Sequence, residues 1–466
     1  MSTLTYQQAL DYLYGFVDYS VERSYRYSPD VFDLGRVQKL LSDLGSPQDS
    51  WPSFHIAGTK GKGSTSSFIA SALRAAGYRT GLYTSPHLLQ FNERIQIDGQ
   101  PISEAELTDL VERVQPAVAA TAGLTMYEVV TAIAFLHFAR GGVNCAVVEV
   151  GLGGRLDATN VLLPLVSVIT SLSYDHTHLL GERLSDIARE KSGIIKPGVP
   201  VVLAPQQQEA EHVVERIAKE RGSDVILVGR DWLFAPVSHD LSGQSLQIWS
   251  AWEQPMMDKF VETGGDEEWA PPRYEIPLLG HHQVVNAAVA YAALKVAADR
   301  GLTIDEASIR KGFQQTVWPA RFQILSHSPV VVVDSAHNRD SALKLRLALD
   351  DYFPRQRVTM IFGASADKDL PGMFEELLPR VSRLIVTQAA HPRAAEPADL
   401  ALLAHRHGAR VEIVVPVEEA LRHALRTQRP EEVILAAGSL FVAGEVLRAW
   451  SLVQPSLPAS QVEARA

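Results

Sequence analysis

The chain has 466 residues, and its composition, 46% hydrophobic and 21% charged, is typical of a folded protein rather than a disordered one. A formal net charge of -11 argues against binding to duplex nucleic acid, because such proteins cluster Lys and Arg to neutralise phosphates. The single cysteine, Cys145, excludes an internal disulfide. The sequence shows no signal-peptide pattern and no apolar run of about 18 residues, so we expect a cytoplasmic protein without a membrane span, with a monomer as the default.

The first half of the chain alternates predicted strands and helices. A short apolar strand ending at Ile56 is followed by a glycine-rich turn and by a helix over 64–76. Further apolar runs over 145–150 and 165–170 predict buried strands, and a helical segment over 128–140 precedes the first of them. Strands that alternate with helices predict an α/β fold with a mostly parallel, doubly wound sheet.

The second half predicts a further α/β domain. Short alternating segments near 206–277 predict a small β appendage on the first domain, and a domain boundary is expected near Gly301. Five apolar runs follow, each with a helical pattern after it, over residues 330–333, 358–362, 384–387, 411–415 and 433–436. We therefore expect domains over 1–300 and 301–455 and a flexible polar tail over 456–466.

A glycine-rich loop follows the first strand over residues 58–64, with the sequence Gly-Thr-Lys-Gly-Lys-Gly-Ser. Glycines let successive backbone N–H groups turn toward phosphate oxygens, and the N-terminus of the next helix adds its partial positive charge. Lys62 is then expected to hold the β- and γ-phosphates of ATP. Gly63 separates Lys62 from Ser64, which departs from the usual phosphate-loop pattern, and a glycine-rich turn without a ligand is the alternative.

Polar side chains stand at the ends of predicted strands, where open α/β sheets bind ligands. Glu149 ends an apolar run, and its buried carboxylate needs a partner, either Mg²⁺ or a nearby Lys or Arg. Asp175, His176 and His178 follow the third strand, where a structural role and metal binding are both open. A Thr-Ser-Pro-His turn at 84–87 is by itself only a rigid turn.

The second predicted domain carries a similar loop. Residues 334–338, Asp-Ser-Ala-His-Asn, follow a Val-rich strand at the ligand-binding edge. Arg321, upstream, offers a guanidinium that can bind nucleotide phosphate through two hydrogen bonds. Each signal is weak alone, because an Asp at the end of a strand is also a common helix N-cap.

With these motifs in this order, nearly the whole chain resembles the dihydrofolate synthase and folylpolyglutamate synthase family, within the Mur ligase superfamily. The resemblance rests on the glycine-rich loop at 58–64, the turn at 84–87, the Glu-Val-Gly-Leu-Gly-Gly-Arg segment at 149–155 and the loop at 334–338. It implies a P-loop ATPase domain followed by a Rossmann-like C-terminal domain. It also implies an ADP-forming ligase that joins an amino acid to an acid.

The resemblance further implies site residues, position by position. The ATP-binding residues would be Gly58, Thr59, Gly61, Lys62, Gly63, Ser64, Asn286, Arg321, Asp334 and His337. The Mg²⁺ ligands would be Ser85, Glu149, His176 and Lys191, the last as a carbamate, and the catalytic residues would be Lys62, Lys191 and His176. The pterin or folate pocket would comprise Thr125, Met126, Tyr127, Glu128, Leu156, Asp157 and Ala158, with Tyr127 in place of the more usual Phe.

The implied activity is ligation of L-glutamate to dihydropteroate, to the glutamate tail of a reduced folate, or to both, through an acyl phosphate. The Thr125 element and Asp157 favour an enzyme with both activities. A cell-wall ligase acting on a UDP-linked acid is the alternative within the superfamily, but only about 57 residues precede the glycine-rich loop, too few for a UDP-binding domain. A P-loop kinase or an ATP-gated binding protein is the alternative from a different class.

Overall fold

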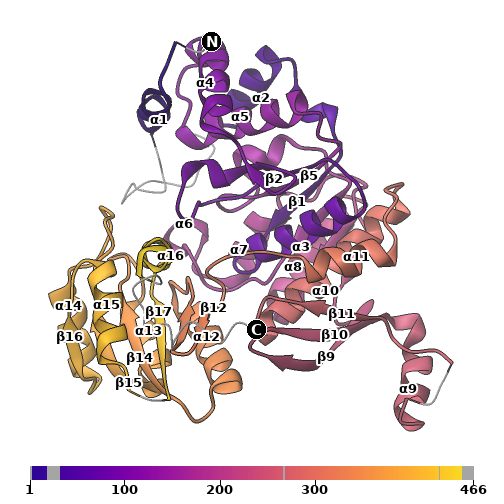
Figure 1. Cartoon of the computed structure of the whole chain (residues 1–466). Coiled ribbons are helices and arrows are strands. Elements are labelled where there is room, and N and C mark those ends of the chain that lie inside the picture. Colours follow the sequence, from indigo (N-terminus) through magenta and orange to yellow (C-terminus); the bar gives the residue numbers. More distant parts are fainter. Residues whose placement is uncertain (1–2, 18–31, 266–267, 430, 454–466) are drawn as a thin grey trace. The chain divides into compact units, whose positions relative to one another are not determined.

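The structure is a computed structural model of the chain and describes residues 3–17, 32–265, 268–429 and 431–453. The flexible tail expected over 456–466 lies outside these residues. The chain divides into two compact units, which are coloured along the sequence in Figure 1. Unit 1 comprises Met1–Ser238, Ser245–Pro277 and Gln283–Thr316, and unit 2 comprises His239–Gln244, Leu278–His282 and Val317–Ala466.

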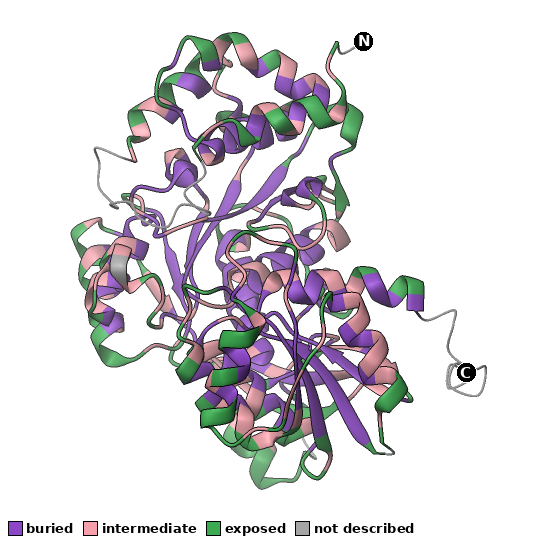
Figure 2. Cartoon of the chain, turned by 90° about the vertical axis from the view of Figure 1, so that its left-hand side faces the viewer, coloured by how far each residue is buried: buried purple, intermediate pink, exposed green. Residues whose placement is uncertain are grey.

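An eight-stranded sheet runs through unit 1 in the order β4-β3-β2-β5-β1-β6-β7-β8. Its strands are β1 (Ser53–Ala57), β2 (Thr80–Tyr83), β3 (Ile95–Ile97), β4 (Gln100–Pro101), β5 (Cys145–Glu149), β6 (Val166–Ile169), β7 (Val201–Leu203) and β8 (Val225–Leu227). Strands β2, β5, β1, β6, β7 and β8 pair in parallel. Strands β3 and β4 form an antiparallel edge beside β2. The central strands are buried (Figure 2), which explains why most of their residues are apolar.

Helices pack on this sheet and bury hydrophobic side chains against it. One core joins α1, α2, α4 and α5 to β2 and β5, and another joins α7 and α8 to β6 and β7. The helices up to residue 314 are α1 (Tyr6–Tyr14), α2 (Leu34–Asp43), α3 (Lys62–Ala75), α4 (Glu104–Ala119), α5 (Met126–Arg140), α6 (Thr177–Leu180), α7 (Leu184–Ser192), α8 (Gln208–Glu220), α9 (Gln254–Glu262), α10 (His281–Asp299) and α11 (Glu306–Gln314). The predicted alternation of buried strands and helices is therefore present in unit 1.

A separate three-stranded sheet follows β8, in the order β11-β10-β9. It comprises β9 (Trp232–Asp240), β10 (Gly243–Ser250) and β11 (Arg273–Ile276), with α9 between the last two. The appendage expected near 206–277 thus begins later, because α8 and β8 belong to the large sheet and its core. Strand β8 is short and only partly buried, so its sequence gives a weak signal.

The boundary between the units lies between Thr316 and Val317 rather than near Gly301. Helix α11 explains the difference, because it packs on α3 of unit 1. The rings of Phe313 and Phe68 lie 5.2 Å apart between centroids, and both side chains are buried. The backbones approach so closely that a Cβ atom on Gly312 would stand 2.4 Å from Ala72 Cα.

Unit 2 contains a six-stranded sheet in the order β12-β13-β17-β14-β15-β16. Its strands are β12 (Gln323–His327), β13 (Val330–Val333), β14 (Arg357–Phe362), β15 (Val381–Val386), β16 (Val411–Ile413) and β17 (Glu432–Ala437). Its helices are α12 (Arg339–Tyr352), α13 (Leu370–Leu377), α14 (Pro397–Arg406), α15 (Val417–Thr427) and α16 (Leu440–Val453). Only β12 is antiparallel to its neighbour, so the mostly parallel α/β class expected from the sequence is confirmed.

Unit 2 has a hydrophobic core of its own. Helices α12, α13 and α14 contribute Leu345, Phe374 and Leu400 to it, packed against buried residues of the sheet such as Met360. Across the part of the chain that the structure describes, no helix combines the length and the apolar character needed to cross a membrane.

Candidate active site

The glycine-rich loop joins β1 to α3 in unit 1. Gly58 and Gly61 have φ values of 151° and 89°, in a region that side chains other than hydrogen rarely allow. The N–H groups of Thr59 and Lys60 both donate to Ser171 O, which ties the loop to the end of β6. Helix α3 begins at the next residue after Gly61 without a side-chain cap, so its first N–H groups can serve a ligand such as phosphate.

Asn286 of α10 lies against this loop. A Cβ atom on Gly61 would stand 2.3 Å from Asn286 Oδ1, so a residue larger than glycine would displace the amide. Asn286 Nδ2 donates to Gln283 Oε1 at 2.9 Å, which fixes the orientation of the side chain. The structure thus brings together two predicted ATP-binding elements that are far apart in the chain.

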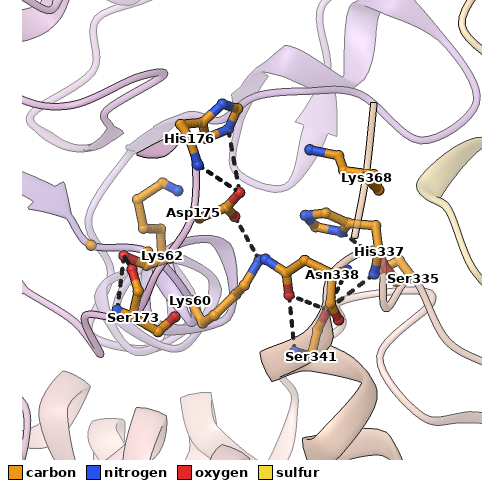
Figure 3. A network of polar contacts seen from close by, with 12 residues as sticks. Lys60, Lys62, Ser173, Asp175, His176, Ser335, His337, Asn338, Ser341 and Lys368 are labelled. Atoms are coloured by element: carbon orange, nitrogen blue, oxygen red, sulfur yellow. Dashed lines mark hydrogen bonds and ion pairs between the residues drawn. The ribbon is translucent and has the colours of Figure 1, made fainter. Parts of the chain in front are cut away.

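Two lysines of the loop pair with carboxylates, one at the end of β5 and the other in the loop between β6 and α6. Lys62 Nζ lies 3.7 Å from Glu149 Oε1, and Lys60 Nζ donates to Asp175 Oδ2 at 3.0 Å. Figure 3 shows both lysines beside Asp175 and His176. The lysine partner that the sequence left open for Glu149 is therefore present, and it places this buried carboxylate beside the phosphate loop.

Lys191, in the last turn of α7, is buried against the same loop. Its Nζ donates to Gly58 O at 2.9 Å. Burial and the positive charge of Lys62 lower the pKa of Lys191 to about 7, and the charge of Asp175 opposes this shift. A substantial fraction of the amine is therefore uncharged and nucleophilic near neutral pH, which carbamate formation with CO₂ requires.

The glycine-rich segment after β5 packs directly on the end of α7. A Cβ atom on Gly154 would stand 2.9 Å from the carbonyl oxygens of Glu190 and Lys191. A Cβ atom on Gly193 would stand 2.4 Å from Arg155 Cα. Arg155 also forms an ion pair with Glu190, at 2.9 Å. These backbone contacts couple the position of the segment to that of Lys191.

Asp157 anchors this segment from within. Its Oδ2 accepts hydrogen bonds from the N–H groups of Gly151 and Leu152, and its Oδ1 accepts from the N–H and the hydroxyl of Thr159. The Thr159 hydroxyl also lies 2.8 Å from His55 Nε2. Because the hydroxyl hydrogen already points to the carboxylate, His55 is the donor in that contact. Burial raises the pKa of Asp157, and the hydrogen bonds oppose that shift.

The other residues predicted to contact a pterin lie around the N-terminus of α5 and beside Asp157. Thr125 is the N-cap of α5 and forms a capping box with Glu128. Glu128 also lies 3.5 Å from Arg36 Nε, and burial raises the pKa of its carboxyl group. The apolar members of the set are all buried: Met126, Leu156 and Ala158.

Tyr127, in the first turn of α5, stacks on Tyr83 of β2 with ring centroids 6.0 Å apart. Its ring end lies over Gly151, where a Cβ atom would stand 2.6 Å from Tyr127 Cζ. The Tyr127 hydroxyl is buried without a hydrogen-bond partner among the described residues, and Ser85 is its polar neighbour. Burial, with Asp157 adding to it, raises the pKa of Tyr127 well above its ordinary value.

Two of the predicted Mg²⁺ ligands, Ser85 and Glu149, offer oxygen atoms, which suit a hard cation, whereas His176 offers an imidazole nitrogen. Ser85 follows β2 and Glu149 ends β5, and because these strands pair in parallel both residues lie at one edge of the sheet. His176 is 41% exposed, with Nε2 3.9 Å from Asp175 Oδ1. In the described ranges no three His, Cys, Asp or Glu side chains could hold a metal by themselves. A cation would need Ser85, a carbamate or phosphate oxygens in addition, and the unpaired Tyr127 hydroxyl beside Ser85 is compatible with bound water.

In unit 2, the predicted residues Arg321, Asp334 and His337 gather around the loop after β13. The Asp334 carboxylate accepts from two backbone N–H groups, at 2.8 and 2.7 Å. Arg321 donates to the Ser335 hydroxyl, and His337 Nδ1 lies 2.9 Å from Ser335 O. Figure 3 also shows Ser335 and His337 in this loop. Burial raises the pKa of Asp334, and the charge of Arg321 opposes that shift.

Sequence reasoning missed His282, a half-buried histidine that lies close to Arg321 and Lys344. Burial and the charges of Lys344 and Arg321 lower the pKa of His282 to about 4. The Gly-His-His run at 280–282, which opens α10, was the visible signal. A histidine whose protonation is opposed by neighbouring cations stays neutral at physiological pH and can donate or accept a hydrogen bond.

Comparisons with known proteins point to one family. The pattern of the Mur ligase middle domain matches residues 56–294, and that of the Mur ligase glutamate ligase domain matches residues 320–440. The Bacillus subtilis dihydrofolate synthase/folylpolyglutamate synthase is 34% identical, over 85% of this chain and 88% of that protein. The Lacticaseibacillus casei folylpolyglutamate synthase is 36% identical, over 89% of this chain and 93% of that protein. The solved structure of E. coli FolC in complex with DHPP and ADP superposes with a TM-score of 0.82 at 29% identity, covering 97% of this chain and 99% of that one.

Proposed function

Because the chain belongs to the dihydrofolate synthase/folylpolyglutamate synthase family of Mur ligases, we propose that it joins L-glutamate to a pterin-containing acid while cleaving ATP to ADP and phosphate. The acid would be dihydropteroate, a reduced folate with a glutamate tail, or both. The observation that most directly supports this is the pairing of Lys62 with Glu149 beside the glycine-rich loop. A loop lysine next to a strand-end carboxylate suits a nucleotide that is bound together with a divalent cation.

The proposed reaction has two steps. A carboxylate oxygen of the acid attacks the γ-phosphorus of ATP, the bond to the β,γ-bridging oxygen breaks, and ADP leaves with that electron pair. The amine of L-glutamate then attacks the acyl carbon, and phosphate leaves as the amide forms and the amine loses its proton. The protein mainly has to align the reactants and offset their negative charge.

The glycine-rich loop would carry most of that work on the ATP side. Lys62 and the first N–H groups of α3 would offset the charge of the β- and γ-phosphates. Bound Mg²⁺ would supply further charge stabilisation by accepting phosphate oxygens as ligands. The full set proposed to bind ATP is Gly58, Thr59, Gly61, Lys62, Gly63, Ser64, Asn286, Arg321, Asp334 and His337.

Lys191 is proposed to act as a carbamate. Its amine reacts with CO₂ in the neutral form, and its lowered pKa makes that form available near pH 7. The product carries a negative charge close to Lys62, which lowers the same pKa by its positive charge. The proposed cation ligands are accordingly Ser85, Glu149, His176 and the Lys191 carbamate.

The acid is proposed to bind beside the N-terminus of α5 and the Asp157 segment. The proposed residues are Thr125, Met126, Tyr127, Glu128, Leu156, Asp157 and Ala158. The relatives support both activities to different degrees, because the Bacillus subtilis protein is named for both and the Lacticaseibacillus casei protein for folylpolyglutamate synthesis alone. We favour an enzyme with both activities.

The test is ADP release with MgATP and L-glutamate, comparing 7,8-dihydropteroate with tetrahydrofolate as the acid. Glutamate-dependent turnover with both acids is the expected result. Turnover with tetrahydrofolate alone would restrict the enzyme to tail extension, and turnover with neither acid would refute the folate assignment. ADP release without glutamate would instead favour a P-loop kinase or an ATP-gated binding protein. The monomeric state and the cytoplasmic location stay predictions. Sedimentation in an analytical ultracentrifuge would check the first, and cell fractionation would check the second.

A further inference from the structure

The buried hydroxyl of Tyr127 differs from neighbouring polar groups of this site that are hydrogen-bonded within the protein. Among the described residues no atom forms a well-aligned hydrogen bond with its oxygen, although Ser85 is close enough to interact with it and the ring packs tightly against Tyr83 and Gly151. A buried polar atom without a partner costs stability, and in native proteins such atoms call for an explanation. The neighbouring Tyr83 hydroxyl, by contrast, lies 3.1 Å from Thr131 Oγ1.

The surroundings of this hydroxyl restrict what can bind to it. Ser85 is its polar neighbour, and Glu149 and Asp157 are the charged groups that act on it. Asp157 already accepts four hydrogen bonds from Gly151, Leu152 and Thr159. A phosphate or a carboxylate would be repelled by the two acidic groups, whereas a hydrated cation would be attracted.

The fold brings the same groups to the edge of the sheet where a cation is expected. Tyr83 of β2 pairs with Val148 of β5, so the residues that follow each strand, Ser85 and Glu149, come to the same edge. Both supply oxygen atoms, which Mg²⁺ and Mn²⁺ prefer, and Mg²⁺ usually keeps several of its waters. Those waters are strong hydrogen-bond donors and need acceptors.

We propose that the Tyr127 hydroxyl oxygen accepts a hydrogen bond from water bound to the divalent cation that Ser85 and Glu149 hold. This inference rests on the proposed function, because it concerns the cation of the ATP site. Tyr127 is thereby a positioning residue for the hydrated cation, and it acts through water rather than as a direct ligand. Groups of this kind behind the metal ligands tune both metal affinity and orientation.

The experiment compares Tyr127→Phe with Tyr83→Phe, which removes the neighbouring hydroxyl from the same ring stack. Mn²⁺ replaces Mg²⁺, and its binding to the full-length enzyme with one equivalent of AMPPCP is followed by electron paramagnetic resonance. Tyr127→Phe should weaken Mn²⁺ binding about ten-fold, the scale found for groups behind metal ligands. Tyr83→Phe should leave it within about two-fold, because Thr131 rather than the cation site is the partner of that hydroxyl.

Thermal unfolding without metal provides a second readout. Tyr127→Phe should unfold at the same temperature as the wild type or higher, because no described residue forms a well-aligned hydrogen bond with the hydroxyl that it removes. Tyr83→Phe should unfold at a lower temperature, because it loses the contact with Thr131.

Wild-type affinity for Mn²⁺ in Tyr127→Phe would overturn the inference, as would an absence of Mn²⁺ binding by the wild type. A higher KM for dihydropteroate with unchanged Mn²⁺ affinity would overturn it too, because it would place the hydroxyl against the acid. Failure of the proposed function is distinguishable, because it appears as missing glutamate-dependent turnover in the wild type while Mn²⁺ binding is measured without turnover.

Discussion

At the residue scale, Lys191 has a chemistry that its surroundings largely determine. We predict that Lys191→Gln lowers kcat at least about 100-fold, the upper range for groups that orient a metal site. The wild type should lose activity as the pH falls below about 7, because protonation of the amine prevents carbamate formation. Enzyme equilibrated with ¹³C-labelled bicarbonate should show a carbamate carbon resonance that is absent from Lys191→Gln.

Lys196→Gln is the matched control for that resonance. Lys196 is half-buried, whereas Lys191 is buried; it donates to Asn160 O, and burial, followed by the charge of Arg221, lowers its pKa to about 8. The labelled signal should persist in this variant. Loss of the signal in Lys196→Gln together with its survival in Lys191→Gln would place the carbamate on Lys196 and contradict this prediction.

The burial that favours the carbamate also makes Lys191 destabilise the folded protein while its amine is protonated. Its pKa is about 7 in the folded protein against an ordinary 10.5, so folding opposes protonation. This cost, at most about 5 kcal/mol, is fully present below pH 7 and is gone above the unfolded pKa. Without CO₂, Lys191→Gln should therefore resist urea better than the wild type at pH 6, and the difference should shrink toward pH 10.

Individual residues also show where sequence reasoning ends. Residue type and position at a strand end left the partner of Glu149 open, and only the family resemblance implied that Lys62 and Glu149 belong to one site. In the structure their side chains lie 3.7 Å apart. The Thr-Met-Tyr-Glu run at 125–128 carries the pattern of a capping box, so the N-cap role of Thr125 is readable from the sequence. The hydrogen bonds that Asp157 accepts from its own loop are not. A carboxylate used locally and one held ready for a ligand look the same in a sequence, because the difference lies in the direction of nearby N–H groups.

At the element scale, the turn between β1 and α3 has the strictest backbone requirement. Gly61→Ala should weaken ATP binding at least about ten-fold, because the new Cβ displaces Asn286 and strains a residue with φ of 89°. Fluorescence titration with an ATP analogue measures the effect.

Gly77→Ala separates the two causes. Gly77 has a similar φ of 87°, but an added Cβ there meets nothing within 4 Å. This control should lose about 1 kcal/mol of stability and keep its affinity for ATP. Equal losses of affinity in the two variants would mean that the contact with Asn286 is unimportant.

Strands that form continuous apolar runs were predictable from the sequence, whereas the place of a helix that packs on a distant element was not. Strands β5, β13 and β17 are continuous apolar runs between polar turns, so the sequence predicted them closely. The boundary expected near Gly301 assigned residues 306–314 to the second domain, whereas α11 belongs to unit 1, because only its packing on α3 reveals where this segment lies. A local pattern shows that a helix has an apolar face but does not show which surface covers it.

At the scale of the whole molecule, each unit has its own hydrophobic core. Scanning calorimetry should therefore resolve more than one transition. Leu345→Ala lies in the core of unit 2 and Leu110→Ala in a core of unit 1. Each should reduce the free energy of unfolding of a different transition by about 2–5 kcal/mol. A single transition that both variants lower equally would contradict this prediction.

The division into units has a consequence for how the chain is made. Unit 2 includes His239–Gln244 and Leu278–His282, two short segments that a ribosome delivers long before Val317, where the main part of unit 2 begins. Gln244 contacts Tyr352 of α12 in the finished unit, so it must wait for more than a hundred further residues to be translated. Domains usually fold in order of synthesis. Here the early core can close first, but it has to leave these segments accessible, and no single cut in the gene would separate two intact halves.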